Sequence, residues 1–136
     1  MGTLEHVNMV SSNVDLTVEF LLTAMPEWYI RGEGTSGKCL RWLHIGDSET
    51  YIAIEDRGIG EKSNHITYHH TGVNHIGFVV ENIEEVISRM RAKGYKEGMH
   101  SLDHPSRLRY YFFDHDDVEY EFVSYHEGMD KNDYSD

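Results

Sequence analysis

The stretch Tyr111–Phe122, YFFDHDDVEYEF, decides the fold, because an earlier stretch of the chain repeats its pattern. Aromatic residues lead into the acidic turn Asp114–Asp117, and apolar and polar residues then alternate as in a half-buried strand. The stretch Ile45–Ile54, IGDSETYIAI, has the same order of strand, turn and strand, and it aligns with Phe113–Phe122. The chain is therefore predicted to contain two copies of one structural unit.

A second pair of stretches supports the repeat and begins each copy. HVNMVSSNVD starts at His6 and HIGFVVENIE starts at His75, and their histidines, asparagines and acidic ends align at one constant offset. Each stretch alternates apolar and polar residues, as a strand does, and then reaches an asparagine that can cap a helix. The two caps are Asn13 and Asn82.

The full set of expected elements has the order βαβββ, twice. In the first copy we expect strands at residues 3–10, 27–31, 38–45 and 49–55, and a helix from the Asn13 cap to about residue 24. In the second copy we expect strands at 73–80, 95–99, 107–113 and 118–125, and a helix that runs to Lys93 and stops at Gly94. This order predicts an α+β fold of two βαβββ modules.

The boundaries follow from the same pattern. Residues 1–126 are expected to form a single domain, with repeat 1 at about 1–58, a linker at 59–71 and repeat 2 at about 72–126. Residues 127–136 are polar and acidic and are expected to be a flexible tail. The loop histidines His65, His69, His70, His100 and His104 fit no metal-site spacing and are interpreted as solvated.

Strand alternation places three candidate metal ligands on the faces of their strands opposite the apolar rows. Val7 and Met9 form the apolar row of the first strand, so His6 and Asn8 point the other way. By the same argument His75 points away from the apolar row of its strand, and Glu121 points away from the aromatic row of the last strand. Two imidazoles and one carboxylate make a facial triad for a divalent first-row metal.

The chain resembles the vicinal-oxygen-chelate superfamily of glyoxalases, bleomycin-resistance proteins and extradiol dioxygenases. Tyr111–Phe122 is similar to that family's signature, Y-x-x-D-P-D-G-x-x-x-E-L, in which Asp114 and Asp116 match the two aspartates and Glu121 matches the metal-binding glutamate. His115 and Asp117 replace the usual proline and glycine. The resemblance covers residues 3 to 125 and implies a curved, mostly antiparallel sheet that forms a cavity, with His6, His75 and Glu121 as metal ligands.

The fourth metal position of the glyoxalase I enzymes aligns with Ala53, which cannot coordinate a metal. Glu55 lies two residues further along the same strand face, and we expect it either to replace that ligand or to act as a general base. No glutathione-binding set can be matched. Asn8, Tyr51, Arg107 and Arg109 are candidate substrate-binding residues, with the two arginines suited to an anionic group.

Composition excludes some partners. The formal charge of −12, from 24 acidic and 12 basic side chains, argues against nucleic acid and anionic membranes. The single cysteine, Cys39, suits a reducing compartment, and the chain shows no leader and no membrane-spanning run, so we expect a cytoplasmic protein.

The resemblance leaves several functions open. The first expectation is a metal-dependent lyase or isomerase, similar to lactoylglutathione lyase, that acts on a small substrate with vicinal oxygens and uses Zn, Ni, Fe, Mn or Co. The alternatives are a metal-free ligand-binding protein of the bleomycin-resistance type, and a dioxygenase or fosfomycin-resistance-like transferase with a His-His-Glu site. A decayed regulatory module is a further class. The family also implies a homodimer.

Overall fold

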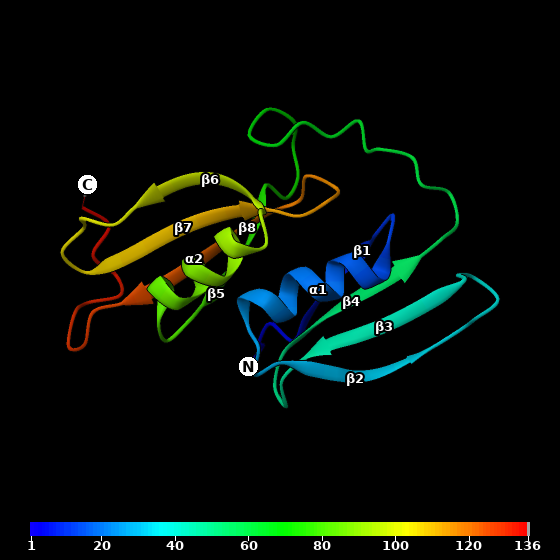
Figure 1. Ribbon diagram of the computed structural model, residues 1–136, viewed down its shortest axis with the longest axis horizontal. Coiled ribbons are helices and arrows are strands. Elements are labelled where there is room, and N and C mark those ends of the chain that lie inside the picture. Colours follow the sequence, from blue (N-terminus) through cyan, green and yellow to red (C-terminus); the bar gives the residue numbers. More distant parts are fainter. Residues whose placement is uncertain (136) are drawn as a thin grey trace. The chain divides into compact units, whose positions relative to one another are not determined.

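A computed structural model describes residues 1–135, and it divides into two compact units, Met1–Ser63 and Asn64 onward (Figure 1). Within the described residues there are two helices and eight strands, in the predicted βαβββ order in each unit.

The first unit holds β1 (His6–Val10), α1 (Val14–Ala24), β2 (Tyr29–Gly34), β3 (Arg41–Gly46) and β4 (Tyr51–Asp56). Its four-stranded sheet has the order β1-β4-β3-β2, with β1 parallel to β4 and the other neighbours antiparallel. α1 lies against β4 and buries the side chains of Val14, Thr17, Phe20 and Leu21, which recur at helical spacing. The fully buried Leu43, Ile45 and Ile54 of the sheet complete this core.

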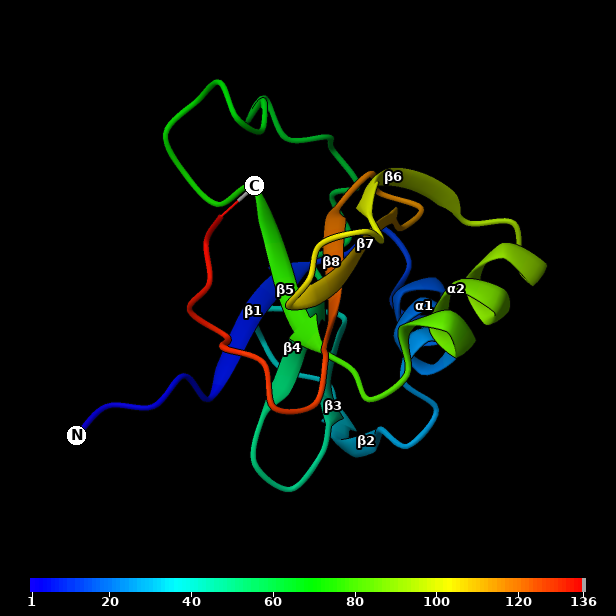
Figure 2. The ribbon, with the colours of Figure 1, turned by 90° about the vertical axis from the view of Figure 1, so that its left-hand side faces the viewer.

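The second unit repeats the plan with β5 (His75–Val79), α2 (Ile83–Ala92), β6 (Lys96–Ser101), β7 (Arg107–Phe113) and β8 (Glu119–Tyr125). Its sheet has the order β5-β8-β7-β6, and β5 is again parallel to its neighbour (Figure 2). α2 lies against β7 and β8, and Phe112, Tyr120 and Phe122 are fully buried. The predicted fold class, an α+β protein of two βαβββ modules, is confirmed.

The helix ends follow the local chemistry that the sequence indicated. Asn13 Oδ1 accepts a hydrogen bond from Leu16 N at 3.2 Å, and Asn82 Oδ1 accepts one from Glu85 N at 3.3 Å. After α2 the chain turns at Gly94, whose φ of +79° lies in the left-handed region that favours glycine. The Gly94 and Tyr95 amides then donate to the carbonyls of Arg91 and Met90, so the last turn of the helix is closed.

All four strands of the first unit begin two or three residues later than predicted, and hydrogen bonds explain the shift for two of them. The strand expected at 27–31 runs from Tyr29 to Gly34, because Trp28 N donates to Met25 O at 3.0 Å and prolongs the turn after α1. The strand expected at 38–45 begins at Arg41, because the Ser36 hydroxyl accepts hydrogen bonds from the amides of Lys38 and Cys39 and keeps them in a turn.

Strand register shows which positions of the two modules are equivalent. Asn8 lies opposite Ala53 in the first sheet, and Gly77 lies opposite Glu121 in the second. His6 and His75 likewise lie opposite Tyr51 and Glu119. Ala53 thus occupies in the first module the place that Glu121 occupies in the second, as the sequence alignment predicts.

No helix within residues 1–135 has the length and apolar character needed to cross a membrane.

Glu97 of β6 connects α2 to β7 and gives the second unit a pH-sensitive contact. It accepts a hydrogen bond from Arg91 Nε at 2.8 Å and another from the Tyr110 hydroxyl. These bonds, that from Tyr110 first, lower the pKa of Glu97 below its ordinary value of 4.5. A carboxyl group whose pKa falls on folding stabilises the fold above its unfolded pKa, and this stabilisation is lost as the pH falls through the folded value.

We therefore expect wild type to be more stable than Glu97→Gln at neutral pH, by a small amount because Glu97 is exposed. The difference should shrink as the pH falls below 4.5, the ordinary value. Urea unfolding of both proteins across this range measures it. A difference that does not change with pH would show that the ionised form of Glu97 contributes nothing.

Candidate metal centre

A histidine and a glutamate meet on adjacent strands of the second unit. His75 begins β5 and Glu121 lies in β8, and the His75 Nε2 and Glu121 Oε2 atoms are 3.0 Å apart. Gly77 faces Glu121 across the strand pair, and a Cβ atom there would make an ordinary van der Waals contact with Oε2 at 3.7 Å. The two side chains are about one quarter and one eighth exposed, at 27% and 13%.

The separation of these two atoms suits a shared metal ion. Imidazole nitrogen and carboxylate oxygen bind first-row divalent metals at about 2.0–2.2 Å, so two such ligands at a right angle are about 3 Å apart. His75 and Glu121 therefore fit as two of three ligands of the predicted His-His-Glu set.

The other nitrogen of His75 is held by two side chains. The Tyr68 hydroxyl lies 2.9 Å from His75 Nδ1 and donates a hydrogen bond to Glu119 Oε1, which is itself 3.5 Å from Nδ1. Burial, the bond to Glu119 and the charges of Glu119 and Glu121 raise the pKa of Tyr68 to about 12, so its hydroxyl keeps its proton at neutral pH. Metal-binding histidines commonly have such a partner on the second nitrogen, where it fixes the ring orientation.

Tyr111 of β7 interacts with both His75 and Glu121. Its ring meets the His75 ring edge-on, with centroids 5.2 Å apart. Burial first, and then the charge and hydrogen bond of Glu121, raise the pKa of Tyr111 well above its ordinary value. Tyr111 thus presents a protonated hydroxyl to Glu121 and limits the positions that this carboxylate can take.

In the first unit, the equivalent histidine is held in a related way. His6 Nδ1 lies 2.8 Å from Glu5 Oε1, which leaves Nε2 as the nitrogen on offer to a ligand. The His6 ring stacks on Tyr51 at 4.8 Å, and Tyr51 stacks in turn on His44 at 4.6 Å. Burial, and then the positive charges of His6 and Arg31, lower the pKa of His44. The guanidinium of Arg31 lies over the Tyr51 ring, 4.4 Å from its centre.

Glu55 follows Ala53 by two residues on β4, and Asn8 lies opposite Ala53 on β1. The Oε2 atom of Glu55 accepts hydrogen bonds from Arg57 Nη2 at 2.9 Å and from Arg57 Nε at 3.3 Å. Its strand partner is Val10, two pairs beyond that of the exposed Asn8 with Ala53. The carboxylate of Glu55 is therefore paired with a cation beside the position of the missing fourth ligand.

The two candidate arginines of β7 differ in what they contact. Arg107 Nη1 donates to the backbone carbonyl of Asp133, and its guanidinium lies 5.8 Å from the centre of the Tyr134 ring, so residues of the acidic tail cover it. His104 Nε2 makes a further contact to Ser135 O at 2.6 Å. The last residue of the expected tail, Asp136, lies outside the described residues.

Among residues 1–135, Arg109 Nε is buried without a hydrogen-bond partner, and the charge of Arg109 acts on Tyr111.

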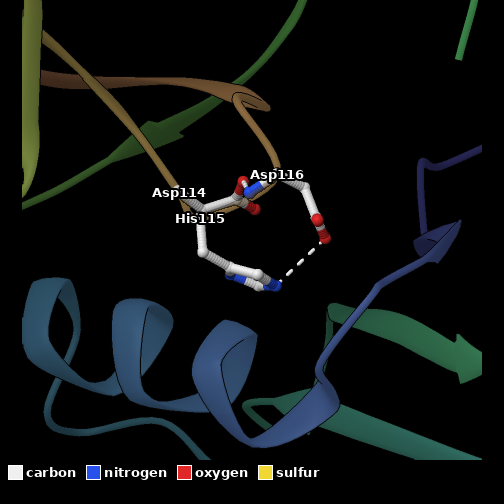
Figure 3. A group of neighbouring side chains, drawn as sticks. All are labelled: Asp114, His115 and Asp116. Atoms are coloured by element: carbon white, nitrogen blue, oxygen red, sulfur yellow. Dashed lines mark hydrogen bonds and ion pairs between the residues drawn. The ribbon is translucent and has the colours of Figure 1, made fainter. Parts of the chain in front are cut away.

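A second group of potential ligands lies in the turn between β7 and β8. Asp114, His115 and Asp116 place one ligand atom each within 4.8 Å of the others, and His115 Nε2 is 3.0 Å from Asp116 Oδ2 (Figure 3). Asp114 is committed to the turn, however. Its Oδ1 accepts from the amides of Asp116 and Val118 at 2.8 and 3.0 Å, and its Oδ2 accepts from the Tyr120 hydroxyl at 3.0 Å.

Burial raises the pKa of Asp114, while these hydrogen bonds act in the opposite direction. Three of the roughly four acceptor positions of this carboxylate are thus occupied within the turn. We therefore interpret the group as the hydrogen-bonded core of the turn, which agrees with the turn that the sequence indicated at 114–117.

Four side chains next to the candidate ligands were not identified from sequence. Glu119 carried a usable signal, because it lies two residues before Glu121 on the same strand face. Tyr111 shares its face with Arg109, which the alternation also shows, and His44 lies opposite Ala53 by register. Tyr68 carried no signal, because it lies in the linker, where no strand or helix period constrains side-chain direction.

Comparisons with known proteins agree with this architecture. The sequence profile of the Glyoxalase/Bleomycin resistance protein/Dioxygenase superfamily matches residues 3–122. Among curated proteins, none matches this sequence.

Solved structures are similar in fold. A glyoxylase/bleomycin resistance protein/dioxygenase domain from Frankia sp. EAN1pec has a TM-score of 0.74 and 17% identity over 95% of this chain and 96% of its own. Glyoxalase I from Leishmania major has a TM-score of 0.74 and 13% identity over 91% and 87%. The fosfomycin resistance protein FosX from Listeria monocytogenes has a TM-score of 0.68 and 17% identity over 91% and 93%.

Proposed function

Because the chain belongs to the Glyoxalase/Bleomycin resistance protein/Dioxygenase superfamily, we propose that it is a metal-dependent enzyme whose ion is held by His6, His75 and Glu121. Its substrate would be a small molecule with two neighbouring oxygen atoms. The observation that supports this most is the 3.0 Å separation of His75 Nε2 and Glu121 Oε2. His6 joins the set by its equivalence to His75 in the repeat, from the same chain or from a second copy in a homodimer.

The metal would act as a Lewis acid that stabilises negative charge on the substrate oxygens. The protein's own part is to orient the ligands and to move a proton. Glu55 is the carboxylate we assign as general base. Since Arg57 occupies its Oε2 atom, Oε1 is the oxygen that would face the substrate. Asn8 lies two residues from His6 on β1, and Tyr51 lies opposite His6 on β4. Arg109 lies near Tyr111 on β7. Asn8, Tyr51 and Arg109 would bind polar groups of the substrate.

Ala53 limits how many ligands the protein would supply to the metal. With alanine at the position equivalent to Glu121, the protein supplies three ligands rather than four. A set of two histidines and one glutamate is suited to a FosX-like addition to fosfomycin or to a dioxygenase, as well as to a lyase or isomerase without a fourth ligand. A metal-free binding protein remains the second candidate, favoured by the stack of His6, Tyr51 and His44 as a surface for a flat ligand.

Turnover tests the proposal. Protein purified without an affinity tag would be supplied with Mn, Fe, Co, Ni or Zn, one at a time, and given the hemithioacetal of methylglyoxal and glutathione, fosfomycin with a thiol or water, or a catechol with oxygen. We expect metal-dependent turnover of at least one substrate. Glu121→Gln should lower kcat/KM by more than about a hundredfold, because loss of a residue that only hydrogen-bonds to a metal ligand already costs up to about that much.

Glu127→Gln, which changes an exposed glutamate beyond β8, is the matched control and should leave kcat/KM unchanged. If the folded protein turned over none of these substrates with any metal but bound a flat ligand without metal, the binding-protein function would replace the proposed one.

A further inference from the structure

We propose that Tyr68 is a positioning residue that fixes the proton of His75 on Nδ1, as the middle member of a relay that ends at Glu119. The proposal deepens the proposed function, since it assigns a role to the segment that leads into β5, and it rests on that function where it treats His75 as a metal ligand. The residues of the relay all belong to the second unit.

The segment before β5 is built to present Tyr68. The amides of His69 and His70 both donate to Ile66 O, and Ile66 N donates to His70 Nδ1 at 2.8 Å, which closes a compact turn. Residues 64–74 form the green loop that leads into β5 (Figure 2). Within it the amide of Tyr68 donates to Asn74 Oδ1 at 2.6 Å.

Tyr68 itself adopts a backbone conformation that bulky residues rarely take. Its φ is +63°, in the left-handed region, which is uncommon for residues other than glycine, asparagine and aspartate. Such conformations persist where surrounding contacts impose them, and they cluster at functional sites. Here the result of the strained conformation is that the hydroxyl reaches His75 Nδ1 at 2.9 Å and Glu119.

The number of protons determines the direction of each bond. A tyrosine hydroxyl carries a single proton, and that of Tyr68 is donated to the Glu119 carboxylate. Its oxygen can therefore take part in the second contact as an acceptor only, so His75 Nδ1 must carry the proton. The relay runs from His75 Nδ1–H to Tyr68 and from the Tyr68 hydroxyl to Glu119.

With the proton on Nδ1, the nitrogen of His75 that has a free lone pair is Nε2, which faces Glu121. A neutral imidazole nitrogen and a carboxylate oxygen 3.0 Å apart are both acceptors, and such a pair requires a proton or a metal ion between them. Tyr68 thus acts at a distance from the ion: it selects the tautomer whose free nitrogen points to the ligand position.

Proton exchange and metal affinity together test the relay. In metal-free protein, the Nδ1–H signal of His75 should exchange slowly with water in nuclear magnetic resonance spectra, and Tyr68→Phe should speed that exchange at least about tenfold. The same variant should lower zinc affinity, measured by competition with a chelator, by about 10–100-fold. Glu119→Gln keeps an acceptor oxygen for Tyr68 and should preserve most of the slow exchange.

Tyr29→Phe alters an exposed tyrosine of β2 and should change neither quantity. If Tyr68→Phe did not fold, Asn74→Ala would serve in its place, because it releases the Tyr68 amide. An exchange rate of the His75 proton within about twofold of wild type overturns the relay. Faster exchange in a protein that binds no zinc would support the relay and at the same time reject the proposed metal function, so the two failures are distinguishable.

Discussion

Replacement of His75 by alanine is expected to lower the zinc affinity of the protein by more than about a hundredfold. Loss of a residue that hydrogen-bonds to a metal ligand costs about 10–100-fold in affinity, and loss of the ligand itself should cost more. The substitution removes the nitrogen that faces Glu121 at 3.0 Å and leaves the Tyr68 hydroxyl without its contact at Nδ1. Zinc affinity would be measured by competition with a chromogenic chelator, at a pH where free imidazole is neutral.

The matched control is His126→Ala, which removes an exposed histidine just after β8 and should leave zinc affinity within about twofold of wild type. His75 belongs to a cluster on the sheet face and not to the buried core. The midpoint temperature of thermal unfolding should therefore change little in the variant. Equal zinc affinity in His75→Ala and His126→Ala would place any bound metal elsewhere in the chain.

Replacement of Asp114 by alanine is expected to lower the free energy of unfolding by about 2–4 kcal/mol while it leaves the number of bound metal ions unchanged. The side chain of Asp114 accepts three hydrogen bonds in the β7–β8 turn. Its loss removes an acceptor from the hydroxyl of the fully buried Tyr120, and removing one partner of a buried hydrogen bond costs about 1–3 kcal/mol. Urea unfolding gives the energy, and metal analysis gives the stoichiometry.

Asp116→Ala is the matched variant for this turn. It removes the other carboxylate of the group, which pairs with His115 near the surface, and should cost less than about 1 kcal/mol. If the turn were itself a metal site, both variants would lose metal. Loss of metal from Asp114→Ala and Asp116→Ala, with His75→Ala unaffected, would move the centre from the sheet face to the turn.

Much of the fold could be predicted because its signals are local and occur twice. Asn13 and Asn82 cap their helices, and the turns at 46–48 and 114–117 separate strands whose successive side chains point to opposite faces. The same alternation brought His75 and Glu121 to one face. Their actual contact depended on the parallel pairing of β5 with β8, which the repeated order βαβββ implies but a single strand does not.

The parts that escaped prediction depend on contacts distant in sequence. Tyr68 lies in a linker without periodicity, and its hydroxyl reaches Glu119, which is 51 residues away. The carbonyl of Asp133 accepts a hydrogen bond from Arg107, 26 residues before it. Neither contact leaves a pattern in the residues that surround it, since a loop side chain can point in any direction that its turn allows.

Both copies of the repeat contribute ligands to the proposed metal centre, and His6 is the ligand that tests it. The decisive measurement is the metal content per chain, by elemental analysis after desalting, of wild type and His6→Ala supplied with equal zinc. We predict that wild type retains about one equivalent and His6→Ala nearly none, as for a site with three protein ligands. Full retention by His6→Ala would contradict the shared centre and leave the metal, if any, to the second copy of the repeat.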